Sequence, residues 1–530
     1  MLVKVNTAAV NALTAIPVSL EVTTEKAQQY MFFMVGLPDS VVRESRTRVE
    51  EAIKSSNFHL PPLTKIVVNF APADVRKEGS GYDLPLALGI LAANSLIQPE
   101  KLEDIIFIGE LGLDGSLRPI KGALPIAIKA RAMGYKALIV PKENVREAAV
   151  VNKLPVYGAE TLAQVVDFLN GASTLQQTIV NTREEFFAAQ TDYPLDFSDV
   201  KGQEGVKRAF EVAAAGGHNI ILIGAPGCGK SMMAKRLPSI LPQLTLSESL
   251  ETTQIYSVAG LLKSGTSLIT RRPFRSPHHT ISDVALIGGN SSFRPGEISL
   301  AHNGVLFLDE LPEFSRTALE TMRQPLEDRQ ISISRAKYNV TLPCSFMLVA
   351  SMNPCPCGYY GDPTHKCMCD PWQIQRYMNK ISGPLLDRID IQCEMTSIPF
   401  SELSKAAPGE PSAAIRERVV AARKIQEERF KEFKGIHCNA QMTEKMLQEF
   451  VAPDEESLRA LRDAMERFSL SARAYSRILK VARTIADLDA CPQVKYPHVA
   501  EAVSYRNLDR GDWAERGISY LYCCFCTDWY

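Results

Sequence analysis

Residues 224–231 are the feature that most restricts how this chain can fold. They read Gly-Ala-Pro-Gly-Cys-Gly-Lys-Ser and match the pattern GxxxxGK[ST] at every fixed position. An apolar run at 219–223 precedes them and a helical pattern at 231–241 follows, so we expect a buried strand, a glycine-rich loop and a helix rather than a chance glycine-rich turn. Such a loop surrounds phosphate oxygens with backbone N–H groups. The candidate nucleotide-binding residues are Gly224, Ala225, Pro226, Gly227, Cys228, Gly229, Lys230, Ser231 and Met232.

Two later apolar runs end in polar side chains that suit the same site. Residues 305–308 are followed by Asp309 and Glu310, and residues 346–352 by Asn353. We expect Ser231 and Asp309 to hold Mg²⁺, Lys230 to reach the β- and γ-phosphates of ATP, and Glu310 to polarise the attacking water. Asn353 is expected to orient that water. An acidic pair after a strand is a weak signal alone, and Asn before Pro is an ordinary turn, but the phosphate loop strengthens both.

Composition excludes some classes of protein. The net charge is −1, so a nucleic-acid role must come from local patches. No apolar run approaches the length of a membrane span, and the N-terminus lacks the pattern of a signal peptide. We therefore expect a cytoplasmic protein without a membrane partner.

Hydrophobic periodicity divides the chain into segments. Strand-like and helical runs alternate over 1–171, which predicts a mixed α/β domain. The polar stretch 172–198 is a predicted linker, and 199–397 a predicted α/β core with a parallel sheet. A second linker is expected at 398–411, a helical domain at 412–511, and a cysteine-containing tail at 512–530 for which we have no functional account.

Further motifs carry a family resemblance. Residues 383–390 read Gly-Pro-Leu-Leu-Asp-Arg-Ile-Asp and 471–473 read Ser-Ala-Arg. With the phosphate loop, Asp309-Glu310 and Asn353, this resembles the AAA+ ATPases of the clade that contains magnesium chelatase and the MCM helicases. The resemblance implies that Arg388 is an arginine finger acting on the neighbouring subunit, the alternative being an ion pair with Asp387 or Asp390. It also implies that Arg473 lies near the γ-phosphate, with Arg477 as the fallback.

The whole chain is similar to one family within that clade. Residues 274–280 and 289–304, together with the front domain, resemble the YifB/ComM family of magnesium-chelatase-like proteins. The resemblance implies a hexameric ring that uses ATP and Mg²⁺ and acts as a helicase or branch-migration motor on single-stranded or branched DNA, in recombination or natural transformation. The alternatives are a chelatase-like or protein-remodelling ATPase and, from another class, an ATP-dependent Lon-like peptidase.

The front domain resembles the Lon-protease fold but lacks its catalytic dyad. The motifs at 72–88 and 109–120 carry the resemblance. Matching them to the family puts Gly81 where the nucleophilic serine belongs and Leu124 where the lysine belongs. Ser80 and Lys121 lie nearby, so a shifted register stays open. Without a nucleophile and an adjacent base there is no covalent route, so we expect a structural or DNA-binding domain.

Four clustered cysteines suggest a metal. Cys355, Cys357, Cys367 and Cys369 form two Cys-X-Cys pairs, and four thiolates can make a closed tetrahedral Zn²⁺ site. The alternative is a reduced loop, and His365 is a possible substitute ligand.

Two basic segments are candidate DNA contacts. Residues 263–282 and 329–361 contain basic side chains with few or no acids, and the resemblance makes them the pore insertions of the ring. A solvated basic face or a subunit interface is the alternative. The candidates are Arg271, Arg272, Arg275, Arg335 and Lys337.

Overall fold

The computed structural model describes residues 2–188, 193–289, 293–335, 338–362, 365–397, 408–433, 435–468 and 470–506. Lys337, residues 398–407 of the second predicted linker and the tail 512–530 lie outside these ranges. The chain forms two compact units. The first comprises Met1–Gln190, Thr245–Thr270 and Ser291–Pro295, and the second comprises Thr191–Leu244, Arg271–Asn290 and Gly296–Tyr530.

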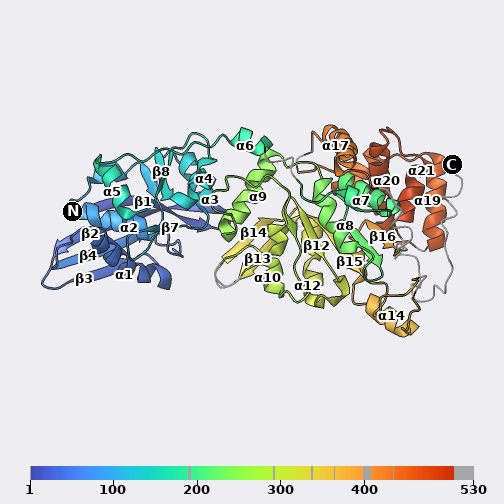
Figure 1. Cartoon of the computed structure of the whole chain (residues 1–530), viewed down its shortest axis with the longest axis horizontal. Helices are drawn as coiled ribbons and strands as arrows, with labels where there is room; N and C mark the ends of the chain where they lie inside the picture. Colours follow the sequence, from blue (N-terminus) through green and yellow to red (C-terminus); the bar gives the residue numbers. More distant parts are fainter. Residues whose placement is uncertain are drawn as a thin grey trace. The chain divides into compact units, whose positions relative to one another are not determined.

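The first unit is built on a seven-stranded mixed sheet with the order β3-β4-β2-β1-β5-β8-β9 (Figure 1). A long hairpin, β1 with β2, starts it, and β5, β8 and β9 continue it in parallel from β1. Helix α2 is apolar around its whole circumference, and all of its residues are buried, as expected of a helix inside a domain core. The main elements are β1 (Leu2–Asn11), β2 (Thr14–Lys26), β3 (Met31–Val35), α1 (Ser40–Ser55), β4 (Thr64–Ala71), α2 (Asp83–Ala93), β5 (Ile105–Phe107), β6 (Glu110–Leu111), β7 (Leu117–Arg118), α3 (Ala123–Ala132), β8 (Ala137–Pro141), α4 (Val145–Ala149), β9 (Val156–Ala159) and α5 (Leu162–Asn170).

Two segments that the sequence assigns elsewhere also pack in this unit. The predicted first linker contains α6 (Thr182–Ala188), whose Phe186 is buried. Helix α9 (Leu246–Ala259), expected inside the ATPase core, bonds to the first unit: Gln254 Nε2 donates to Leu13 O at 2.9 Å, and Ser257 O accepts from Gly122 N at 3.0 Å. The compact units therefore do not follow the predicted boundary, because contacts made far along the chain leave no signal in local periodicity.

The second unit contains the predicted parallel sheet. Its strands run in the order β11-β12-β15-β10-β16, and every neighbouring pair is parallel. All five residues of β10 are buried, because helices and loops cover both faces of such a sheet. The elements are α7 (Glu204–Gly216), β10 (Ile220–Gly224), α8 (Lys230–Arg236), β11 (Phe274–Arg275), α10 (Asp283–Ile287), α11 (Glu297–Leu300), β12 (Val305–Leu308), α12 (Arg316–Thr321), α13 (Arg323–Asp328), β13 (Gln330–Arg335), β14 (Tyr338–Pro343), β15 (Met347–Met352), α14 (Pro371–Met378), α15 (Gly383–Leu386) and β16 (Ile391–Met395).

A helical region completes the second unit, as the periodicity predicts. It consists of α17 (Ser412–Arg429), α18 (Glu444–Phe450), α19 (Glu455–Phe468), α20 (Ala472–Leu488) and α21 (Tyr496–Ser504) (Figure 1). Helices α17 and α20 pack against α7, and their apolar side chains share one core with β10 and β16. Across the described ranges, no helix combines the length and apolar character needed to span a bilayer.

Candidate active site

The phosphate loop joins the carboxyl end of β10 to the first residue of α8. Gly227 and Gly229 adopt φ values of 80° and 97°, which side chains with a Cβ rarely adopt and which turn the backbone N–H groups inward. Because β12 and β15 run parallel to β10, their carboxyl ends meet at the same edge of the sheet. The sheet thus brings the loop, Asp309 and Asn353 together, as the sequence predicts for one site.

Lys230 is held at the centre of this edge. Its Nζ donates to Gly224 O at 2.6 Å, to Ala225 O at 3.0 Å and to Asn353 Oδ1 at 3.1 Å. Burial lowers the pKa of Lys230, and the nearby negative groups, Asp309 among them, only partly offset this. An ammonium held by neutral oxygens gains strongly from a phosphate anion, so the arrangement suits a nucleotide.

Ser231 and Asp309 form the expected pair of oxygen ligands. Ser231 Oγ donates to Asp309 Oδ2 at 2.8 Å. A hydroxyl beside a carboxylate supplies the hard oxygen donors that Mg²⁺ prefers, so these residues fit the ion. Ser351, which the sequence analysis missed, donates its Oγ to Asp309 Oδ1. It lies in β15, one residue from the end of the strand, and fixes the carboxylate from the other side.

Glu310 occupies a special backbone position. Its φ of 54° and ψ of 51° are left-handed, which is uncommon for a residue other than glycine. The Glu310 N–H donates to Ser351 Oγ at 3.3 Å, and the Glu310 Oε2 lies 3.5 Å from His279 Nδ1. Glu310 and Asn353 share the lining of a pocket of about 590 Å³ with Trp372 and Tyr377 of α14. The carboxylate therefore faces a space open to a water molecule.

Arg388 lies at the opposite edge of the same sheet. Asn219, which directly precedes β10, donates its side-chain amide to Arg388 O at 2.9 Å. The Arg388 guanidinium donates to Pro384 O at 2.7 Å and pairs with the Glu327 carboxylate. The alternative ion pairs with Asp387 and Asp390 are not the ones formed. Arg388 is therefore remote from the phosphate loop of its own chain.

The two candidate sensor arginines share this edge with Arg388. Arg473 Nη1 lies 3.4 Å from Asp387 Oδ2, and Arg477 Nη1 lies 2.8 Å from Asp390 Oδ1. Burial alone would raise the pKa of Asp390, but the charge of Arg477 and a hydrogen bond from His218 hold it below its usual range. The expected position of Arg473 beside the γ-phosphate is thus not met within one subunit, because the lid packs at the edge where the strands begin.

Two of the candidate DNA contacts have structural partners instead. Arg272 donates to the backbone oxygens of Pro242 at 2.6 Å and Asn303 at 2.8 Å. Arg275 forms a bidentate pair with Glu297, with both distances 2.6 Å. Their segment has no acid of its own, but Glu297 arrives from later in the chain. Arg271 is exposed, and Arg335 ends β13 in the antiparallel hairpin β13–β14, in register with Tyr338 of β14.

The Lon-like position in the first unit carries no dyad. Leu124 is fully buried, and a Cβ on Gly81 would lie 3.1 Å from Ile108. In the shifted register, Ser80 Oγ donates to the Glu110 carboxylate, and Lys121 lies along Gly260. The partners of Ser80 and Lys121 therefore give the serine no lysine base, which speaks against a peptidase.

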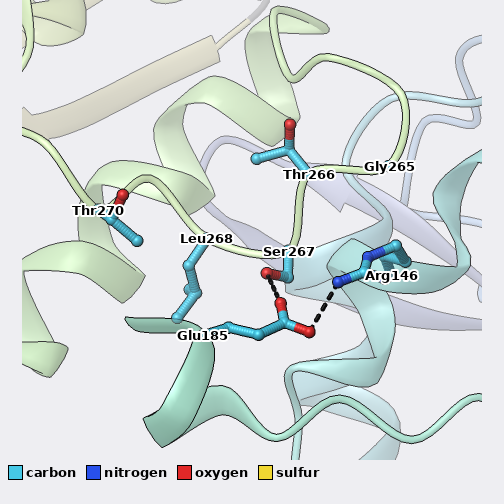
Figure 2. Close-up of a pocket in the computed structure, with 7 residues that line it drawn as sticks. All are labelled: Arg146, Glu185, Gly265, Thr266, Ser267, Leu268 and Thr270. Carbon is cyan, nitrogen blue, oxygen red and sulfur yellow. Dashed lines mark hydrogen bonds and ion pairs between the residues drawn. The ribbon is translucent and has the colours of Figure 1, made fainter. Parts of the chain in front are cut away.

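A separate pocket of about 540 Å³ lies in the first unit (Figure 2). Its charged side chains serve each other, because Glu185 of α6 accepts from Ser267 Oγ at 2.6 Å and from Arg146 Nη2 at 2.7 Å. These bonds attach α6 to the unit, and none of the predicted site residues lines this pocket.

The four predicted metal ligands come together beside the phosphate loop. The sulfur atoms of Cys355, Cys357, Cys367 and Cys369 all lie within 4.8 Å of one another. His365, the predicted substitute, is 62% exposed in its side chain and contacts Asp362 instead.

Comparisons with known proteins cover nearly the whole chain. The family model of subunit ChlI of Mg-chelatase matches residues 20–144, that of magnesium chelatase, subunit ChlI, matches 196–403, and that of the ChlI C-terminal region matches 409–506. Competence protein ComM of Haemophilus influenzae is 43% identical over 482 residues, which cover 90% of this chain and 92% of that protein. The uncharacterized protein YifB of Escherichia coli is 43% identical over 507 residues, 96% of this chain and 97% of that protein.

Two more distant similarities are shorter. Lon protease 2 of Bacillus subtilis is 29% identical over 160 residues, 28% of each chain. The DNA replication licensing factor Mcm2 of Drosophila melanogaster is 24% identical over 208 residues, 37% of this chain and 20% of that protein.

Proposed function

Because the chain belongs to the YifB/ComM family of magnesium-chelatase-like proteins, we propose that it is an ATP-driven motor of the AAA+ type that acts on DNA. The observation that carries the ATPase part is the shared edge of the sheet. There Lys230 contacts Asn353, while Ser231 and Ser351 contact Asp309. Two oxygen ligands, a cation and a carboxylate that faces water are the groups that phosphoryl transfer requires.

Each side chain has a task in hydrolysis. Lys230 offsets charge on the β- and γ-phosphates, Asn353 orients the attacking water, and Glu310 accepts its proton. Mg²⁺, when bound by Ser231 and Asp309, bridges phosphate oxygens and neutralises part of their charge. Asp309 is kept in position for this by Ser351.

The arginine that completes the site comes from a second copy of the chain. Arg388 is held at the edge where β16 begins, whereas the phosphate loop is at the edge where β10 ends. An arginine that offsets transition-state charge must touch the phosphoryl group, so this one serves a neighbour. Such a head-to-tail arrangement closes into a ring, and we propose the hexamer that the family resemblance implies.

The substrate is proposed to be single-stranded or branched DNA. The hairpin β13–β14, with Arg335 at the end of β13, suits contact with phosphates in a central channel. Arg271 stays a candidate, whereas Arg272 and Arg275 are removed from the set by their intramolecular bonds. The similarity to a competence protein favours branch migration during recombination or natural transformation, in the cytoplasm. The family-model names keep a chelatase-like or protein-remodelling ATPase as the second candidate.

Salt dependence of DNA binding separates the two candidates. We expect fluorescence anisotropy of a labelled three-way junction to report binding that falls steeply between low and physiological salt, because phosphate contacts release counterions. An Arg271→Gln/Arg335→Gln variant should flatten the slope by about two counterions. The matched control is Lys431→Gln, which removes a charge with a side chain 73% exposed from the lid. Absence of DNA binding, with ATP hydrolysis intact, would favour the remodelling ATPase.

A further inference from the structure

The four clustered cysteines have the geometry of a mononuclear metal site. Their sulfur atoms lie 3.3 Å apart for Cys355–Cys357, 3.5 Å for Cys357–Cys367 and 3.7 Å for Cys355–Cys367. A tetrahedral zinc–thiolate centre with Zn–S bonds of about 2.3 Å has sulfur–sulfur edges of about 3.8 Å. Without any rearrangement of the backbone, the sulfurs are already arranged around one ion.

Other uses of four thiols fit these distances less well. A disulfide requires sulfur atoms about 2.05 Å apart, and all four residues are free thiols. An iron–sulfur cluster inserts several irons and sulfides between its cysteines, for which a span of 4.8 Å leaves no room. The donor set is soft and closed, with no position left for a substrate, as in structural rather than catalytic zinc sites.

The cluster packs directly on the nucleotide site. Cys355 follows Asn353 by two residues, and Cys355 O accepts from Gly358 N at 3.0 Å. This closes a tight turn in which Gly358 has a φ of 86°. A Cβ placed on Gly358 would lie 2.7 Å from Pro226 Cδ of the phosphate loop. The turn that carries the first two ligands thus contacts Pro226 and continues into the residue that bonds Lys230.

We propose that Cys355, Cys357, Cys367 and Cys369 bind one Zn²⁺ that fixes Asn353 and the phosphate loop in position. The ion ties the turn at 355–358 to the segment 367–369, which leads into α14 on the other side of the pocket beside Glu310. Loss of the ion releases the turn, so Asn353 and Pro226 lose their support. The consequence for nucleotide affinity rests on the proposed ATP site, whereas the metal site itself does not.

Metal analysis tests the site directly. We expect the purified full-length protein to contain about one zinc per chain, and a Cys367→Ser/Cys369→Ser variant to contain almost none. The matched control is Cys491→Ser, which removes a cysteine outside the cluster and should keep the zinc. Cobalt-substituted wild-type protein should show the thiolate charge-transfer and tetrahedral d–d bands, a readout that does not depend on the variant folding. Wild-type protein without zinc and without these bands, or with iron in place of zinc, would overturn the assignment.

A glycine pair tests the contact with the phosphate loop. Gly358→Ala retains all four thiols, so it should keep its zinc, but the new methyl group must displace Pro226 and we expect at least a fivefold weaker dissociation constant for a fluorescent ATP analogue. Gly361→Ala is the control: Gly361 also has a positive φ, of 77°, but a Cβ there meets nothing within 4 Å. Equal affinity of the Gly358→Ala and Gly361→Ala proteins would overturn the supporting role. Wild-type protein that holds zinc but binds no ATP would instead refute the proposed ATPase and leave the metal site standing.

Discussion

Replacing Arg388 with alanine should leave ATP binding intact and slow hydrolysis about 10³-fold, because this arginine serves the nucleotide of a neighbouring subunit. The magnitude within one chain can be worked out from the sheet. Asn219 binds Arg388 O just before β10, and Lys230 binds Gly224 O at the end of β10. Five strand residues, at about 3.3 Å each, separate the two ends by roughly 16 Å.

That separation limits what Arg388 can do to its own site. At roughly 16 Å and an effective dielectric constant of about 20, a unit charge contributes at most about 1 kcal/mol, a roughly fivefold effect, and salt reduces it further. An arginine in contact with the phosphoryl group is worth about 10³-fold or more in kcat, at least ~4 kcal/mol. A thousandfold loss with an unchanged Kd is therefore too large to arise within one subunit.

Mixing two inactive proteins is the assay. Arg388→Ala retains an intact phosphate loop and Lys230→Ala retains an intact arginine, so mixed rings contain interfaces with both. We expect ATPase activity to rise with the fraction of the second protein and then fall. The matched control is Glu327→Gln, which removes the ion-pair partner of Arg388. Glu327 has a side chain 63% exposed, so this pair is worth about 0–1 kcal/mol and its loss should change turnover little.

Two results would refute this reasoning. One is the absence of recovery at every ratio in rings verified to be mixed. The other is a Glu327→Gln protein as slow as Arg388→Ala, which would make the ion pair itself the cause.

Three further predictions concern the edge that carries the phosphate loop. Lys230→Ala should lower ATP turnover by at least ~10²-fold in a coupled phosphate-release assay, because it removes the cation at the β- and γ-phosphates; near-normal turnover would exclude this loop as the active site. Glu310→Gln should bind ATP with normal affinity and hydrolyse it about 10²–10⁴-fold more slowly, since an amide cannot accept the proton of water; failure to bind ATP would indicate a structural role. Ser351→Ala should raise the Mg²⁺ concentration for half-maximal activity about fivefold, corresponding to one hydrogen bond of ~1 kcal/mol to Asp309. The control is Ser299→Ala, since the buried Ser299 Oγ has no hydrogen-bond partner in the described part of the chain, and an equal shift in both variants would remove Ser351 from the site.

The parts of the site that the sequence predicts are those in which local order and chemistry coincide. The phosphate loop is contiguous, and its strand and helix flank it directly. Asp309 and Asn353 each end an apolar strand, so a parallel sheet brings them to one edge whatever the details of the connections. The four cysteines were also recognisable, because both pairs lie within a short stretch of chain.

The parts that were missed depend on partners remote in sequence. Ser351 faces inward from a strand that looks uniformly buried, and nothing local shows that Asp309 lies opposite. Arg275 appeared unopposed until Glu297 was brought to it, and Glu327 was not among the partners considered for Arg388. Helix α9 was assigned to the ATPase core by chain order, but it packs in the first unit. Such pairings are set by tertiary contacts and have no periodic signature.

Displacement of a labelled strand from a three-way DNA junction tests the central claim most directly. The account predicts ATP-dependent displacement by the wild-type protein, and none by Glu310→Gln, although that variant should still bind both ATP and the junction. Wild-type protein that hydrolyses ATP at full rate yet neither binds the junction nor displaces the strand would contradict it.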